Sequence, residues 1–459
     1  MSPSDVTSDL CGRDLKFTRD FTVAELRARR QRIAELIGAG AHLLVPAAPP
    51  VPEDRRVQDA NFYYFSGFEI CHAYLLVEGG SGRTSLFVPP RDAMAGEEPG
   101  NRVGIEDAAQ IRERVGADEV SPSSLLRQAL APVPRLYLPQ AEVEGGGATR
   151  FGANACAARR EAEEWDQAEP RHKRMIRLLR ERLPGVALED ACPLINRLRT
   201  IKSPAEIAVL RQAGQLSATV MIEAMKVTRP GIVENRLHAI AEYVFRDRGH
   251  CGPGYGVIAT GGTRTWDRHY HVNNATLRDG EMVLMDCGPD LRHYTSDIAR
   301  MWPVNGVFDP WHRQVYGLIA EYHKTLLRLI RPGVLPADIY AEAARRMAAL
   351  CANPASGLAG ARPLLDRMIA RNVRYLNHGV GLSVHDAIDP AWRDEPLREG
   401  FVCALDPMIW CEDEHEYIRV EDTIVVTADG CERLTGDAPF EIDAVEALMK
   451  AECRMRNAE

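Results

Sequence analysis

Apolar residues recur at helical spacing over a long segment in the second half of the chain. A helix is predicted to begin at Pro204, because Ser203 and Glu206 form a capping box around a first-turn proline. The helix should end before Pro230, since the residue that precedes a proline is disfavoured in the α conformation. One face of this helix carries the residues Ile207, Leu210, Gly214, Ala218, Met221 and Met225.

The first half of the chain alternates shorter apolar segments with turns. Residues 21–38 have the spacing of a helix, residues 142–156 are rich in glycine and alanine and predict a loop, and residues 157–182 predict a charged helix. Short runs typical of strands occupy His42–Val45, Phe62–Phe65, Ala73–Val77 and Ser85–Val88. This mixture predicts an α/β domain.

A weak internal repeat divides the second half. Residues 229–231 and 331–333 both read Arg-Pro-Gly between two long helical segments, 102 positions apart. Two further pairs follow in the same order, residues 280–286 with 400–406 and residues 296–298 with 420–422. Such drift in spacing is typical of two related halves with small insertions. We expect the halves to meet across an approximate two-fold axis.

Length and composition narrow the class of protein. The 459 residues are enough for two or three domains, and the interspersed charges, −9 in total, disfavour a nucleic-acid-binding protein. The longest apolar runs are too short and proline-rich to span a membrane, and residues 1–17 lack the apolar core of a secretory signal. Eleven scattered cysteines without a Cys-x-x-Cys pair favour a reducing, cytoplasmic location.

Two aspartates at the ends of apolar strands are candidates for chemistry. Asp286 and Asp297 flank a turn at Gly288–Asp290, and in an antiparallel hairpin their side chains can lie on one face. Left without a cation, two adjacent carboxylates repel each other, so that one must retain its proton. A divalent cation removes this repulsion.

The second repeat adds further donors at corresponding places. The combined set is Asp286, Asp297, His378, Asp406 and Glu421. Four carboxylates and one imidazole exceed the needs of one metal, and they suit two divalent ions bridged by Asp297, Glu421 and a water. Carboxylate-dominated coordination favours Mn²⁺, with Zn²⁺, Co²⁺ or Fe²⁺ as alternatives. Two such ions produce a hydroxide nucleophile at neutral pH, which indicates hydrolysis.

No other hydrolytic motif competes with this set. The chain contains no Gly-x-Ser-x-Gly turn, no phosphate-binding loop and no His-Glu-x-x-His helix. Four histidines, His269, His271, His293 and His385, lie near the candidate ligands and each can be an ordinary hydrogen-bonded or exposed side chain. His385 is the best placed of them to contact a substrate and to donate to a developing oxyanion.

The ordered ligand set, with Pro303–Gly306 (Pro-Val-Asn-Gly) and Val384–Asp386 (Val-His-Asp), resembles the pita-bread metallopeptidases. The similarity is to the Xaa-Pro aminopeptidase (aminopeptidase P) and prolidase branch, and Asp59–Phe68 resembles the aminopeptidase P N-terminal domain. The resemblance implies an α/β (α+β) fold, with a mixed α/β domain at residues 1–199. A pita-bread catalytic domain with internal pseudo-two-fold duplication is implied at residues 200–459.

The same resemblance implies roles for individual residues. Asp286 and Asp297 would hold one ion, His378 and Asp406 the other, with Asp297 and Glu421 bridging. Three further residues match family positions: His269 and His385 line the substrate pocket, and Arg419 lies beside the bridging glutamate. The implied substrates are small peptides with proline at the second position. The implied assembly is a homodimer or homotetramer.

Two departures from the family pattern leave alternatives open. Asp406 stands where the family usually has glutamate, and Arg374 stands where it often has a further histidine. The nearest alternative activity is that of a prolidase, which cleaves only Xaa-Pro dipeptides. The alternative from another class is a non-catalytic pita-bread module that binds peptides or proteins.

Overall fold

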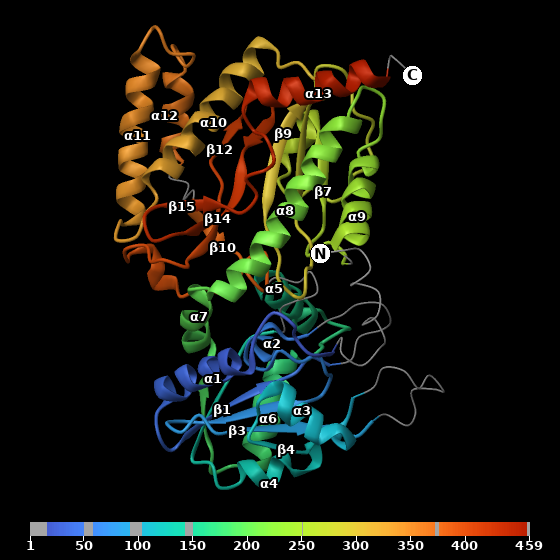
Figure 1. Ribbon diagram of the computed structural model, residues 1–459, viewed down its shortest axis with the longest axis vertical. Coiled ribbons are helices and arrows are strands. Elements are labelled where there is room, and N and C mark those ends of the chain that lie inside the picture. The colour runs from blue at the N-terminus through green and yellow to red at the C-terminus, as the bar shows by residue number, and fades with distance from the viewer. Residues whose placement is uncertain are drawn as a thin grey trace. The chain divides into compact units, whose positions relative to one another are not determined.

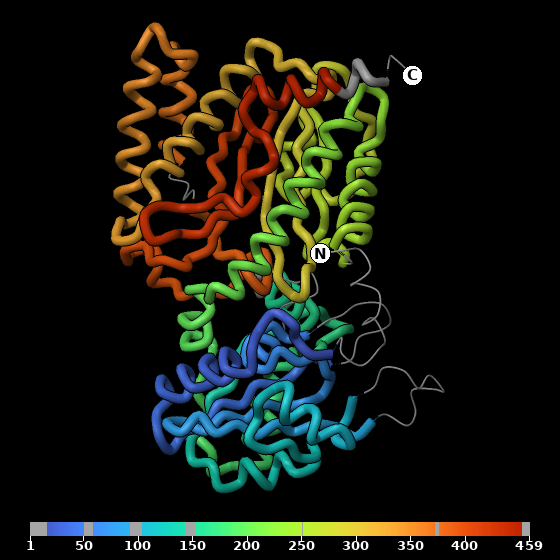
Figure 2. Tube along the Cα trace, viewed as in Figure 1, coloured from blue at the N-terminus to red at the C-terminus, as the bar shows by residue number. Residues whose placement is uncertain are grey.

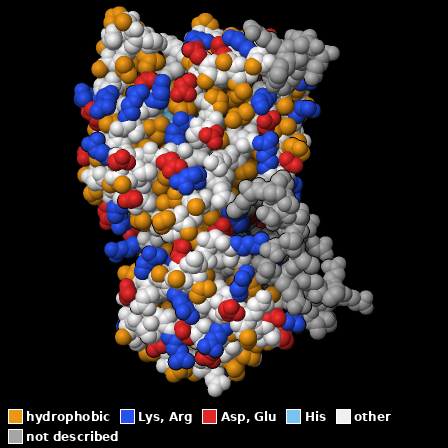
Figure 3. Space-filling view, viewed as in Figure 1, with side chains coloured by type: hydrophobic (Ala, Val, Ile, Leu, Met, Phe, Trp, Pro, Cys, Tyr) orange, Lys and Arg blue, Asp and Glu red, His pale blue; other side chains and the backbone are white. Residues whose placement is uncertain are grey.

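The computed structural model describes residues 16–49, 58–91, 103–142, 150–249, 251–371 and 376–456. The chain forms two compact units, one up to Arg199 and the other from Thr200. None of the helices within the described ranges is long and apolar enough to cross a membrane. Figure 3 shows basic and acidic side chains interspersed over the visible face.

The first unit is built on a mixed six-stranded sheet in the order β4-β3-β2-β1-β5-β6 (Figure 1). β1–β2 and β2–β3 are antiparallel, while β1–β5, β3–β4 and β5–β6 are parallel. The strands are β1 (Ala41–Pro46), β2 (Tyr74–Glu78), β3 (Thr84–Val88), β4 (Glu119–Pro122), β5 (Arg135–Leu138) and β6 (Ala187–Asp190). The α-helices are α1 (Val23–Ile37), α2 (Ala60–Ser66), α3 (Ala108–Val115), α4 (Leu126–Leu130), α5 (Arg150–Ala162), α6 (Arg171–Arg182) and α7 (Cys192–Thr200).

Two local predictions for this unit were wrong. The apolar run Phe62–Phe65 is part of helix α2 and not a strand. The Asp59 side chain accepts from the Phe62 backbone N–H, and Gly67 ends the helix at φ 58°, so the chain caps both ends of a helix that is buried on every side. Total burial removes the periodicity by which a helix is recognised.

The second local error concerns the segment that follows. The predicted loop at residues 142–156 gives way to α5 at Arg150, and residues 143–149 lie outside the described residues. The predicted single helix is two helices, α5 and α6, with Pro170 as the N-cap residue of α6. A proline restricts the residue before it and lacks a backbone N–H, so it begins a helix more readily than it continues one.

The second unit contains an antiparallel sheet whose strand order mirrors itself. The order is β10-β11-β14-β9-β8-β7, so that β7-β8-β9 and β10-β11-β14 meet at the β9–β14 pair, where Glu421 faces Ala299. The strands of the sheet are β7 (Ile258–Gly261), β8 (Met282–Cys287), β9 (Ile298–Pro303), β10 (Leu376–Gly379), β11 (Val402–Leu405) and β14 (Glu421–Val426), with β15 (Cys431–Arg433) beside β14. This order confirms the predicted pseudo-two-fold duplication.

Each half of the sheet comes with its own pair of helices. α8 (Pro204–Val227) and α9 (Asn235–Gly249) flank the first Arg-Pro-Gly, while α10 (Pro310–Leu329) and α11 (Pro336–Ala352) flank the second. Figure 2 shows the first half in green to yellow on one side of the unit and most of the second in orange to red on the other. The predicted capping box at Ser203 and Glu206 is present. The remaining α-helices are α12 (Arg362–Ala370) and α13 (Ile442–Arg456).

The three strands at the centre of the second sheet are buried along their whole length. Every residue of β8, β9 and β14 is buried, and their apolar side chains belong to the main hydrophobic core. Polar residues on these strands must therefore be paired or bind an ion. That condition applies to the carboxylates at the ends of these strands.

Candidate metal centre

Strands β8 and β9 bring the first two predicted ligands together. Asp286 lies opposite Ala299, and strand alternation places Asp297 on the same face two residues earlier. The Tyr255 hydroxyl oxygen lies 2.9 Å from Asp286 Oδ1 and 2.8 Å from Asp297 Oδ1. A side chain at Gly288 would place Cβ 1.9 Å from the Ser296 carbonyl oxygen, so glycine is needed for this close approach.

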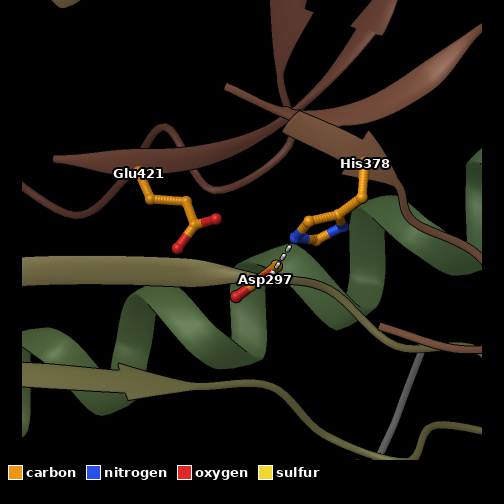
Figure 4. A group of neighbouring side chains, drawn as sticks. All are labelled: Asp297, His378 and Glu421. Atoms are coloured by element: carbon orange, nitrogen blue, oxygen red, sulfur yellow. Dashed lines mark ion pairs between the residues drawn. The ribbon is translucent and has the colours of Figure 1, made fainter. Parts of the chain in front are cut away.

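The second half of the sheet supplies the facing donors. His378 lies in β10 and Glu421 begins β14, and both point toward Asp297 (Figure 4). His378 Nε2 is 3.4 Å from Asp297 Oδ2. Asp297, His378 and Glu421 offer ligand atoms that all lie within 4.8 Å of one another. Such a cluster has the size of a single metal-binding site.

Arg419 joins the other carboxylates to this cluster. It ends β13 (Glu416–Arg419), which pairs with β12 (Met408–Cys411). Its Nη1 is 3.0 Å from Asp286 Oδ2 and its Nε is 2.9 Å from Asp406 Oδ1, while Nη2 contacts Glu421. Arg419 and Tyr255 thus connect the four predicted carboxylate ligands, and His378 joins them through Asp297.

The charges of this constellation are unbalanced. Four carboxylates and one guanidinium share a buried site. Burial, and for Asp286 the neighbouring charge of Asp297, raises the pKa of Asp286 to about 7 and that of Asp297 to about 6. Burial likewise raises the pKa of Asp406 and of Glu421, although Arg419 opposes this. Additional positive charge is needed before all four carboxyl groups can ionise at neutral pH.

The residues present fit divalent cations. Asp406 Oδ2 and Glu421 Oε1 are buried and have no hydrogen-bond partner within the described residues. Burial lowers the pKa of His378 to about 4, so its imidazole is neutral and can act as a ligand. Hard oxygen donors, a neutral imidazole and two unpartnered carboxylate oxygens are the ligand chemistry of a divalent metal. Asp406 is linked to the other carboxylates through Arg419 Nε, which donates to its Oδ1 at 2.9 Å.

The two histidines predicted to contact substrate are exposed side chains close to candidate ligands, His385 beside His378 and His269 within electrostatic reach of Asp286. His385 is exposed, and its ring centroid is 4.1 Å from that of His378. His269 is exposed on the loop that follows the 3₁₀ helix η5 (Gly262–Trp266). Because both imidazoles are exposed, they are available to a bound molecule. Arg374 lies outside the described residues.

Sequence reasoning missed Tyr255. This residue stands in a Gly-Tyr-Gly run shortly before β7 and has no counterpart in the repeat, so the pattern of corresponding carboxylates did not point to it. One phenolic proton can be donated to only one of the two aspartates at a time. Tyr255 therefore orients both carboxyl groups without neutralising either.

Two family models match the chain. The model of metallopeptidase family M24 matches residues 208–428. The model of the aminopeptidase P N-terminal domain matches residues 26–135. The Xaa-Pro aminopeptidase of Escherichia coli (strain K12) is 31% identical, over 93% of this chain and 98% of that protein. Xaa-Pro aminopeptidase 3 of Homo sapiens is 30% identical, over 85% of this chain and 76% of that protein.

Solved structures agree with these matches. Aminopeptidase P from E. coli with the inhibitor Pro-Leu superposes with a TM-score of 0.75 at 28% identity, covering 95% of this chain and 99% of the other. A zinc-substituted form of E. coli aminopeptidase P in complex with product gives a TM-score of 0.73, again at 28% identity, over 94% of this chain and 99% of the other. With matches along both units, the chain belongs to metallopeptidase family M24, in its aminopeptidase P branch.

Proposed function

We propose that this chain is a metal-dependent Xaa-Pro aminopeptidase that uses two divalent ions. Asp286 and Asp297 would hold one ion and His378 and Asp406 the other, with Asp297 and Glu421 bridging them. The observation that carries the proposal is a set of four buried carboxylates beside the half-buried His378, in which Asp406 Oδ2 and Glu421 Oε1 have no hydrogen-bond partner among the described residues. The family supports a divalent metal, and we favour Mn²⁺ because carboxylates dominate the set.

The chain's own residues would prepare the site for amide hydrolysis. Divalent ions, when bound, activate water and polarise the scissile carbonyl. Tyr255 and Arg419 hold the ligand carboxylates in place through hydrogen bonds. His269 and His385, exposed beside the ligands, would donate hydrogen bonds to the charge that develops on the carbonyl oxygen.

The proposed substrates are small peptides with proline at the second position. Both relatives named above are Xaa-Pro aminopeptidases, and the match to the E. coli protein extends over nearly the whole of both chains. An Xaa-Pro bond is a tertiary amide with no N–H, so the site must recognise it through shape and its carbonyl group. A prolidase shares this chemistry and differs in accepting dipeptides alone.

Release of the first residue from matched peptides tests the function. We expect cleavage of Xaa-Pro-Yaa and Xaa-Pro-Pro peptides in the presence of Mn²⁺, and little cleavage of Xaa-Ala peptides or after metal removal. Cleavage of Xaa-Pro dipeptides alone would favour the prolidase. Fewer than one bound ion per chain after Mn²⁺ addition, with no cleavage, would favour the non-catalytic binding module.

Location and assembly stay predictions. The described cysteines are free thiols, which accords with the reducing, cytoplasmic location expected from the sequence. A homodimer or homotetramer is expected from the family resemblance. Size-exclusion chromatography with light scattering would measure the assembly directly.

A further inference from the structure

The loop that carries His269 is exposed at its tip but anchored at both ends. It leaves β7 after Gly261, passes through η5 and returns at Ala275. Arg268, His269 and His271 are exposed at the tip, where the His269 backbone N–H donates to Asp267 Oδ1 and the Arg268 guanidinium lies over the Trp410 ring. An imidazole that must meet a substrate at a defined position therefore depends on how the two ends of its loop are held.

One buried carboxylate joins the two ends. Glu234 is fully buried, and its Oε1 accepts from the Gly261 backbone N–H at 2.9 Å. Its Oε2 accepts from the Ala275 backbone N–H at 2.9 Å. The backbone N–H of Glu234 also donates to the Ala275 carbonyl oxygen at 2.9 Å. Each carboxylate oxygen of Glu234 thus accepts from one end of the loop, and the side chain holds the two ends together.

Two neighbouring side chains complete the anchor. Arg264, within η5, donates through Nε to Glu234 Oε1 at 2.8 Å and compensates the buried negative charge. The Thr260 hydroxyl lies 3.2 Å from the same oxygen. Asn273 is buried at φ 50° and bonds to the backbone of Val257 and Ala259 in the segment that enters β7. The ends of the loop are therefore rigid, while its tip remains free to meet a ligand.

We infer that Glu234 is a positioning residue for His269, acting by holding the two ends of the His269 loop together. The second repeat supports a specific task for Glu234, because the corresponding position after its Arg-Pro-Gly is Pro336, which begins α11. A purely structural requirement of the repeat would call for similar side chains in both halves. The inference rests on the proposed function, since it assigns His269 to substrate binding.

Glu234→Gln tests this role with little change in volume. The amide can accept at one end only, so either the Gly261 or the Ala275 N–H loses its acceptor. We expect kcat/KM for an Xaa-Pro-Yaa peptide to fall about tenfold, because small displacements of a substrate-contacting group are costly. In the His269→Ala background the same substitution should cause little further loss, since Glu234 acts through His269. The inference would be overturned if the double variant lost kcat/KM by the product of the two single-variant losses.

A readout independent of catalysis separates this inference from the proposed function. Hydrogen–deuterium exchange in residues 262–275 of the Mn²⁺-loaded protein should rise in Glu234→Gln, with the number of bound ions unchanged. If no Xaa-Pro peptide is cleaved by the unsubstituted protein, the proposed function fails; unchanged exchange overturns the loop anchor whatever the activity.

Two further variants control for general destabilisation. Thr228→Val removes the buried hydrogen bond from Trp302 in the same half and should leave exchange in the loop unaltered. Arg264→Gln removes one contact of Glu234 but keeps both backbone contacts, so it should give a smaller change in the same direction. It also serves as the test if Glu234→Gln does not fold. Equal loop exchange in Arg264→Gln and the unsubstituted protein would then contradict the anchor.

Discussion

The two halves of the second unit share a strand order but anchor their substrate-facing histidines differently. In the first half, Glu234 accepts backbone N–H groups at both ends of the His269 loop. In the second half, a buried ion pair next to His385 holds the loop that carries this histidine. Lys202 Nζ lies 3.0 Å from Asp386 Oδ2, and the Asp386 backbone N–H donates to the Gly379 carbonyl oxygen at the base of the His385 loop.

The difference indicates which parts of a duplicated fold stay alike. Strand pairing depends on backbone groups that every residue carries, so both halves keep the same ladder and supply ligands at matching places. Loop conformations depend on individual side chains, so each half holds its histidine loop with different residues. The carboxylates follow the same rule: Tyr255 orients those of the first half, while Arg419 contacts Asp406 and Glu421 of the second and also Asp286.

Removing one ligand from either half should have the largest effect. Asp297→Asn in the first half and His378→Ala in the second should each lower kcat/KM about 10³-fold or more, because the ions are shared between the halves. Bound metal measured by atomic emission should fall in both variants. Retention of full activity in either one would mean that the halves do not form a single site.

Breaking the buried ion pair of the second half should cost the most stability. Lys202→Met removes the cation that lies 3.0 Å from the buried Asp386 carboxylate, and we expect a loss of about 3–5 kcal/mol in the free energy of unfolding. Lys202→Met with Asp386→Asn should recover part of that loss. Denaturant unfolding measures the free energy of unfolding of both variants. The exposed ion pair of Arg362 and Asp366 is the control, and Arg362→Ala should lower the free energy of unfolding by about 0.5 kcal/mol or less. Equal losses in the single and double variants would contradict a stabilising pair.

Tyr255→Phe probes the orientation of the first-half carboxylates alone. The substitution removes the hydroxyl that lies between Asp286 and Asp297 and keeps the ring. We expect affinity for Mn²⁺ to fall about 10- to 100-fold, as measured by calorimetric titration, because groups that orient ligands tune metal affinity by that amount. Tyr243→Phe, an exposed position on α9, is the matched control and should bind metal normally. Unchanged affinity in Tyr255→Phe would restrict Tyr255 to a packing role.

The smallest expected effect distinguishes the helix starts of the two halves. α8 is capped by Ser203, whereas α10 is capped by Asp309, whose side chain also contacts His312. Burial alone would lower the pKa of His312, but hydrogen bonds to Glu416 and Asp309 outweigh it and raise the pKa.

Because the folded pKa is raised, this stabilisation is complete below the unfolded value of about 6.5 and is lost as the pH rises through the folded pKa. We expect the free energy of unfolding to decrease over that interval. His312→Gln should abolish this part of the pH dependence in denaturant titrations. If the free energy of unfolding depends on pH in the same way in the variant, His312 is excluded as the source of that dependence.

Much of the fold followed from local sequence. Three features depend only on neighbours within a few residues, and each was predicted correctly. They are the α8 capping box, the Arg-Pro-Gly breaks between helices, and the apolar strands that end in carboxylates. The repeat also predicted two related halves, and the mirrored strand order confirms them. Five candidate ligands were found because they occupy corresponding places in two halves and resemble a family pattern. Their assignment to individual ions is still a prediction.

Other features were decided only by tertiary structure. Phe62–Phe65 forms a helix because caps at Asp59 and Gly67 override an apolar run that has no helical period. Tyr255, Glu234 and the pair of Lys202 with Asp386 act on groups that are distant in sequence or on backbone atoms, and neither kind of contact leaves a periodic signal. The sequence by itself determined the repeat and the apolar strands that end in carboxylates, because these depend on local spacing and duplication. The tertiary structure determined how the donors and loops are held, because that depends on which buried groups meet after folding.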